Sequence, residues 1–198
     1  MADVQLTEKV ANIDLDGTLA AFMDKLLKEL NRMRSPDESE FTHFDVENPP
    51  EWLDARMDYI KQHPGFWANL EVIPEGMRIL EMLKDAGLTI NILTKGPRKA
   101  TNAWTEKLLW VQRHVGEGHM TLTTDKGLVY GRLLFDDFPP YILRWLEWRP
   151  RGVVLMLDSH WNKDFRHPSV VRVGRIEDGT FDQSLPAVEA AIKLAVER

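Results

Sequence analysis

The sequence predicts an α/β protein in which helices flank a mainly parallel sheet. Three observations support this fold class. Short apolar runs alternate with amphipathic helical stretches, which is the pattern of strand–helix–strand units. Most of these runs are apolar throughout, as expected for strands that helices cover on both faces. The length of 198 residues suits one domain with a small insertion.

The apolar runs place the strands along the chain. The predicted strands are residues 10–15, 88–93, 119–123, 132–135, 152–157 and 169–173. Because the helices between them leave room for crossover connections, neighbouring strands are expected to run parallel.

The helices between the strands have recognisable ends. Residues 74–86 begin at Pro74, which suits a first helical position, and are followed by Gly87, which suits a helix end. Residues 98–115 carry an apolar stripe of helical period and are followed by Gly116. The stripe consists of Ala100, Ala103, Trp104, Leu108, Val111 and Val115. A last amphipathic helix contains Leu185, Val188, Ile192 and Ala195.

One segment interrupts the alternation of strands and helices. Nearly sixty residues separate the first strand from Pro74, and they show helical character but no convincing strand. Because so long a structureless connection is uncommon, we interpret residues 20–72 as a small helical cap. Pro36, Pro49-Pro50 and Pro64-Gly65 divide it into pieces. The core domain is then predicted to comprise residues 1–19 and 73–198.

Composition excludes several classes of protein and partner. The chain has 25 Lys and Arg against 31 Asp and Glu, a formal net charge of −6, and no Cys. This balance gives no support for duplex nucleic acid or a membrane surface as partner, and cysteine chemistry is excluded. The polar start MADVQLTEKV has no signal core, so we expect a cytoplasmic protein. We allow for a homodimer.

An acidic motif follows the first predicted strand. Asp14 and Asp16 are separated by one residue and followed by Gly17, which permits the chain to bend. The carboxyl ends of parallel strands meet at one edge of a sheet, where ligands bind. The alternative interpretation is an Asp-rich turn in which Asp16 caps the next helix.

Three further motifs favour a functional site at this edge. The second strand ends at Thr94-Lys95-Gly96, Lys126 follows the third, and Asp136-Asp137 end the fourth. Taken alone, the first two motifs suit ordinary polar turns. Adjacent carboxylates repel each other unless a cation is near, and oxygen ligands favour Mg²⁺. We therefore expect Mg²⁺ as cofactor.

The order of these motifs resembles that of the haloacid dehalogenase superfamily. The amino-acid sequence around the motifs resembles that of its 5′(3′)-deoxyribonucleotidases. The similar stretches are Asp14–Phe22, Pro64-Gly-Phe-Trp67 with Leu70–Gly76, Glu106-Lys107 with Trp110-Val111, and Thr124–Asp137. His160-Trp-Asn162 is a weaker match to the same family. The resemblance implies a Rossmann-like core and Mg²⁺-dependent removal of phosphate from (deoxy)nucleoside 5′-monophosphates.

The resemblance also implies a role for each motif residue. Asp14 is the expected nucleophile, which forms an aspartyl-phosphate, and Asp16 is the expected general acid and base. Thr94 would hold the phosphoryl oxygens, and Lys126 would neutralise charge on Asp14 and on the transferred group. Asp14, Asp137 and the Asp16 carbonyl would ligate the metal, and Asp136 would hold a metal-bound water.

The substrate side of the site is less constrained by the sequence. Phe22 is the best candidate for stacking on a base, and Trp67 and Gly96 are further candidate substrate contacts. Phe66 and Trp67 are expected mainly in the cap core, as are Trp52 and Tyr59. Lys95 stands where the family has Ser, and it either adds a second cation over the phosphate or points into solvent.

Two alternatives to a nucleotidase stay open at this point. The same chemistry could act on another small phosphate ester such as a sugar phosphate, because Lys95 and residues 30–62 depart from the family. The fold could also serve as a nucleotide-binding sensor without catalysis.

Overall fold

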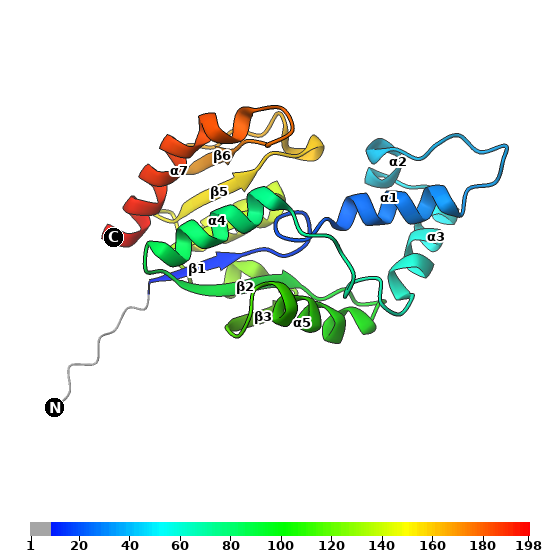
Figure 1. The fold of residues 1–198 in the computed structure, drawn as a ribbon, viewed down its shortest axis with the longest axis horizontal. Helices are drawn as coiled ribbons and strands as arrows, with labels where there is room; N and C mark the ends of the chain where they lie inside the picture. The colour runs from blue at the N-terminus through cyan, green and yellow to red at the C-terminus, as the bar shows by residue number, and fades with distance from the viewer. Residues whose placement is uncertain (1–8) are drawn as a thin grey trace. The chain divides into compact units, whose positions relative to one another are not determined.

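The computed structural model describes residues 9–198 and contains a six-stranded sheet (Figure 1). Its strands are β1 (Val10–Ile13), β2 (Thr89–Lys95), β3 (His119–Thr123), β4 (Leu133–Asp136), β5 (Val153–Leu157) and β6 (Val170–Val173). They lie in the order β3-β2-β1-β4-β5-β6, and every pair is parallel. The predicted parallel α/β fold is therefore confirmed, and each predicted strand is present within about two residues of its expected ends.

Helices connect the strands. The α-helices are α1 (Phe22–Arg32), α2 (His43–Glu47), α3 (Glu51–Gln62), α4 (Pro74–Asp85), α5 (Asn102–His114), α6 (Pro139–Trp148) and α7 (Thr180–Glu197). Two short 3₁₀ helices are η1 (Lys126–Leu128) and η2 (His160–Asn162). Among residues 9–198, no helix combines the length and the apolar character needed to cross a membrane.

The chain divides into two compact units. The described part of the sheet unit comprises residues 9–19, Ile73–Lys95 and Gly118–Arg198, and the helical unit comprises Ala20–Val72 and Gly96–Glu117. Residues 96–117, which hold α5, group with the helical unit, whereas the predicted core domain includes them. The predicted division into a core domain and a cap remains a prediction about folding units. Residues 1–8 of the predicted core, which make up most of the polar start MADVQLTEKV, lie outside the described part of the chain.

The sheet unit buries apolar side chains on both faces of its sheet. Successive residues of a strand point to opposite faces. Leu134 of β4 and Val154 and Met156 of β5 pack in one cluster with Ile142 and Trp145 of α6. The alternate residues of the same strands are equally buried, and α7 contacts β5 and β6. Figure 1 shows α4 and α7 on the same side of the sheet. Burial on both faces explains why these strands are apolar throughout.

The helical unit follows the proline pattern of its sequence. α3 begins directly after Pro50 and ends two residues before Pro64, where proline favours helix starts and disfavours continuation. Leu53, Met57 and Ile60 form the buried face of α3. The predicted helical character of residues 20–72 is confirmed.

Two helix predictions need correction. The buried residues of α5 are Ala103, Lys107, Trp110 and Val111, whereas Trp104 and Leu108 of the predicted stripe are 41% and 42% exposed. The apolar pattern did not predict the burial of Lys107. Its ammonium lies 4.7 Å from the centre of the Trp67 ring, so its aliphatic stem can be buried. In addition, α6, which begins with two prolines, was not predicted from the sequence.

Candidate functional site

The candidate site lies at the carboxyl edge of the central strands of the sheet unit. Asp14 directly follows β1, Thr94 and Lys95 end β2, and Asp136 ends β4. β1 lies between β2 and β4, so parallel pairing brings these ends together. The structure therefore gathers residues from three separate stretches of the chain, as the motif order predicted.

Three carboxylates form the centre of the site. One oxygen of each of Asp14, Asp136 and Asp137 lies within 4.8 Å of the others, and all three residues are buried. Lys126 reaches into this cluster from η1, with its ammonium 2.7 Å from Asp14 Oδ1 and 2.7 Å from Asp136 Oδ2. Lys126 is only 3% exposed, so its ammonium lies among these carboxylates rather than in solvent.

Burial strongly perturbs these charged groups. Burial raises the pKa of Asp14 to about 7; Lys126 opposes this rise, whereas the negative charges of Asp136 and Asp16 add to it. The pKa of Asp137 is also raised, first by burial and then by Asp136 and Asp14. Burial disfavours the charged form of Lys126, but Asp136 and Asp14 outweigh it and raise its pKa.

The charge balance of the cluster fits a bound cation. One ammonium faces three buried carboxylates, so ionising all of them without another positive charge is costly. The donors are oxygen atoms, which hard divalent cations prefer. The residues present can therefore hold a metal ion at Asp14, Asp136 and Asp137.

The turn after β1 fits closely around Asp137. Gly17 has a φ of +84°, and a Cβ added there would lie 2.5 Å from Asp137 Oδ2. The hydroxyl of the buried Thr18 donates a hydrogen bond of 3.0 Å to Asp137 Oδ1. Glycine thus supplies both the left-handed backbone and the space that the carboxylate occupies.

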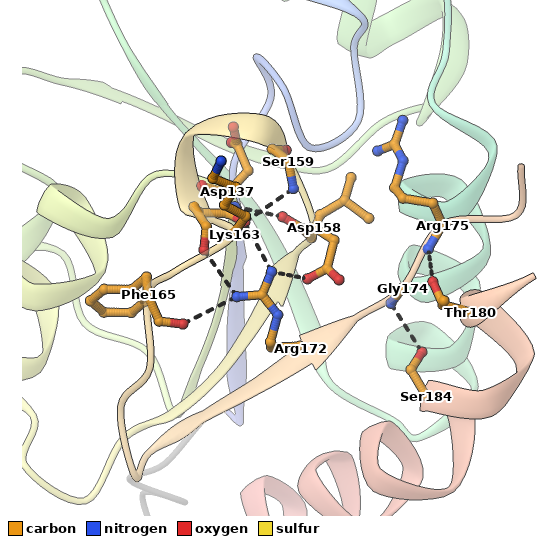
Figure 2. A network of polar contacts seen from close by, with 12 residues as sticks. Asp137, Asp158, Ser159, Lys163, Phe165, Arg172, Gly174, Arg175, Thr180 and Ser184 are labelled. Atoms are coloured by element: carbon orange, nitrogen blue, oxygen red, sulfur yellow. Dashed lines mark hydrogen bonds and ion pairs between the residues drawn. The ribbon is translucent and has the colours of Figure 1, made fainter. Parts of the chain in front are cut away.

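A second group of residues holds the backbone of Asp137. The side-chain amide of the buried Asn162 donates to the Asp137 carbonyl at 2.7 Å, and Trp161 Nε1 donates to the same oxygen at 3.1 Å. Arg172 of β6 donates a hydrogen bond to Asn162 Oδ1 and forms an ion pair with Asp158 (Figure 2). This support was not predicted from the sequence, although His160-Trp-Asn162 after β5 was an available signal.

Thr94 and Lys95 occupy the end of β2. Thr94 is completely buried. Lys95 is exposed, but its ammonium lies 5.2 Å from the centre of the Tyr141 ring, and Lys126 lies 4.7 Å from the same centre. Lys95 therefore does not simply extend into solvent.

The other predicted substrate contacts belong to the helical unit. The Phe22 ring stacks on Trp67 with centres 5.1 Å apart and meets Phe66 edge-on. Phe66 and Trp67 are each 4% exposed, which confirms their place in the core of this unit. At Gly96, a Cβ would lie 2.3 Å from the Trp104 ring. Substrate contact by Phe22, Trp67 and Gly96 remains a prediction.

Two aromatic residues of the helical unit do not lie where we expected them. Trp52 is 52% exposed and Tyr59 is 64% exposed, so the prediction that they pack in the core is wrong. Leu53, Met57 and Ile60 take the buried face of α3 instead, which turns Trp52 and Tyr59 outward because of the helical period.

Most of the sequence is similar to nucleotidases. A family model described as 5′ nucleotidase, deoxy (pyrimidine), cytosolic type C protein matches residues 8–175. A protein of Bordetella pertussis named "Putative 5′(3′)-deoxyribonucleotidase" is 32% identical over 162 residues, which cover 77% of this chain and 84% of that protein. A protein of the same name from Bordetella bronchiseptica is 31% identical, with the same coverage.

Solved structures support the fold. A haloacid dehalogenase family IA hydrolase from Entamoeba histolytica has a TM-score of 0.52 at 12% identity and covers 93% of this chain and 99% of its own. A haloacid dehalogenase-like hydrolase from Burkholderia xenovorans also has a TM-score of 0.52, at 18% identity, and covers 89% of this chain and 97% of its own. The chain therefore belongs to the 5′-nucleotidase, deoxy (pyrimidine), cytosolic type C family, on a haloacid dehalogenase fold, and is a hydrolase of phosphate monoesters.

Proposed function

We propose that this protein dephosphorylates (deoxy)nucleoside 5′-monophosphates with Mg²⁺ as cofactor, through an aspartyl-phosphate on Asp14. The observation that carries the proposal is the position of Asp14. Its carboxylate is buried, lies 2.7 Å from Lys126 and shares a cluster with Asp136 and Asp137. Family membership supports the choice of nucleotides as substrates.

The metal would be held by this chain's acidic groups. Asp14, Asp137 and the backbone carbonyl of Asp16 are the proposed direct ligands, and Asp136, which already accepts bonds from Lys126 and the Phe138 N–H, is the proposed holder of a water. When bound, Mg²⁺ offsets the repulsion between the Asp14 carboxylate and the phosphate.

In the first step, a carboxylate oxygen of Asp14 attacks phosphorus and the bond from phosphorus to the ester oxygen breaks. Asp16 donates a proton to the leaving oxygen. It follows Asp14 by two residues, and its charge acts on that carboxyl. Lys126 and Thr94 stabilise the charge on the transferred group.

In the second step, Asp16 takes a proton from water, and the water oxygen attacks phosphorus. The bond from phosphorus to Asp14 breaks, which releases inorganic phosphate and regenerates the carboxylate. A single carboxyl group can serve as acid and then as base because the two steps have opposite proton demands.

A substrate panel tests this proposal. We expect the protein with Mg²⁺ to release phosphate fastest from deoxynucleoside or nucleoside 5′-monophosphates. Asp14→Asn should abolish turnover, and acid quenching should trap phosphate on the wild-type protein but not on the variant. Equal phosphate release by Asp14→Asn and the wild type would refute the nucleophile.

The same panel distinguishes the alternatives. Faster hydrolysis of a sugar phosphate would favour another small ester, for which Lys95 in place of the family's Ser is the motivating observation. Nucleotide binding in calorimetry without phosphate release would favour a sensor. The cytoplasmic location and the homodimer remain predictions, to be checked by cell fractionation and by light scattering.

A further inference from the structure

The ring of Tyr141 contacts two lysines of the candidate site. Its centre lies 4.7 Å from the ammonium of Lys126 and 5.2 Å from that of Lys95. Both distances fall within the range of about 6 Å in which the negative face of an aromatic ring attracts a cation. One side chain therefore holds the ends of two cationic residues that are 31 positions apart in the sequence.

For Lys126, the ring adds a third contact. An ammonium has three N–H donors, and two of the neighbours of this ammonium are Asp14 and Asp136, each at 2.7 Å. Its side chain is only 2% exposed. The aromatic contact thus helps to keep Lys126 between the two carboxylates.

For Lys95, contact with the ring restricts the position of the ammonium. Lys95 is exposed and ends β2 beside the buried Thr94. A lysine side chain has many rotamers, so an exposed lysine at a strand end is usually spread over many positions. Contact with Tyr141 selects those in which the ammonium lies near the ring that also contacts Lys126.

The ring is itself fixed by the segment that carries Asp136. Tyr141 is the third residue of α6, after Pro139 and Pro140. Its ring meets the Phe138 ring with centres 4.9 Å apart, and its N–H donates to the Phe138 carbonyl. The Phe138 N–H in turn donates to Asp136 Oδ1 at 2.9 Å. The position of Tyr141 is therefore coupled to the acidic cluster.

We infer that Tyr141 is a positioning residue, which holds Lys95 beside Lys126 so that the phosphate of the substrate meets two cations. This inference rests on the proposed phosphatase function and deepens it. It assigns Lys95 to recognition of the dianionic phosphate, where a lysine contributes charge with little directional demand.

Steady-state kinetics on a deoxynucleoside 5′-monophosphate tests the inference. Tyr141→Leu removes the aromatic face, and we expect KM to rise about threefold to tenfold and kcat to fall by a similar factor. Tyr141→Phe keeps the face and should recover most of kcat/KM relative to Leu. If Phe is as impaired as Leu, the hydroxyl rather than the ring is required and the inference is wrong.

A double-mutant cycle separates the two lysines. Lys95→Met alone should raise KM. In that background, Tyr141→Leu should no longer raise KM, although the fall in kcat through Lys126 should persist. An unchanged KM effect of Tyr141→Leu in the Lys95→Met background would overturn the inference. Leu143→Ala, at a 44% exposed position of the same helix, is the control for effects on α6.

Binding of inorganic phosphate keeps this test separate from the proposed function. If the wild-type protein hydrolyses no phosphate ester, the proposed function fails, and calorimetry with phosphate then decides on Tyr141 alone. We expect Tyr141→Leu to weaken phosphate binding by about threefold or more while its melting temperature stays near that of Leu143→Ala. Equal phosphate binding in Tyr141→Leu and the wild type would contradict the inference.

Discussion

At the scale of single residues, Gly17 shows how the backbone and the site constrain each other. It combines a φ of +84° with a Cβ position 2.5 Å from Asp137 Oδ2. Gly87 has a similar φ of +76°, but nothing lies within 4 Å of its Cβ position. A comparison of alanine substitutions at the two glycines therefore separates the cost of the left-handed backbone from the cost of displacing a carboxylate.

Gly17→Ala is expected to lower both stability and activity. A non-glycine residue at this φ costs about 1–2 kcal/mol, and the added methyl group must also displace the Asp137 carboxylate. Gly87→Ala should show a similar backbone cost in urea unfolding but keep kcat/KM. If Gly87→Ala loses as much activity as Gly17→Ala, then contact with Asp137 is not the reason.

At the scale of elements, two stretches that resemble the nucleotidase family contact each other within the helical unit. Glu106 of α5 accepts hydrogen bonds from the backbone N–H groups of Gly65 and Trp67 at 2.9 and 3.0 Å. Trp110 Nε1 donates to the Leu70 carbonyl at 2.8 Å. These hydrogen bonds join Glu106 and Trp110 of α5 to the segment from Gly65 to Leu70.

Glu106→Gln should destabilise the protein in a pH-dependent way. Burial opposes ionisation, but hydrogen bonds from Gly65, Asn102, Trp67 and Ala68 outweigh it and lower the pKa of Glu106 below 4.5. A lowered folded pKa means that the stabilisation is present above pH 4.5 and is lost as the pH falls through the folded pKa.

Urea unfolding at several pH values measures this effect. We expect Glu106→Gln to cost about 1–2 kcal/mol at pH 7, and the difference from the wild type should shrink as the pH falls through the lowered pKa of Glu106. Glu81→Gln, which removes an exposed pair with Lys84, should change the free energy of unfolding by less than about 0.5 kcal/mol. A pH-independent cost at Glu106 would show that its charge plays no part.

At the scale of the whole molecule, binding of a cation at the acidic cluster should stabilise the fold. A ligand at 100 times its Kd adds about 2.7 kcal/mol, which for a chain of this size corresponds to a rise in Tm of about 5–10 °C. We expect Mg²⁺ to raise the Tm of the wild-type protein and EDTA to reverse the rise.

Asp137→Asn should remove most of this stabilisation because it removes one of three clustered carboxylates. Asp85→Asn, at an exposed position at the end of α4, should leave the rise in Tm intact. A rise of the same size in Asp137→Asn and the wild type would place the bound cation elsewhere.

The sequence by itself determined the strands, the helices α4, α5 and α7, the helical character of residues 20–72 and the motif residues of the sheet edge. The strands could be predicted because burial on both faces requires continuous apolar runs. Asp14, Thr94 and Asp136 could be predicted to meet because strand ends in a parallel sheet converge. Both arguments need only the order of elements along the chain.

Only the tertiary structure decided the contacts that complete the site. Lys126 lies between Asp14 and Asp136, Asn162 holds the Asp137 carbonyl, and Tyr141 joins two lysines. The buried face of α5 was likewise decided by Lys107 and Trp67. These contacts join residues from 10 to 112 positions apart, so they depend on packing between elements rather than on any local pattern.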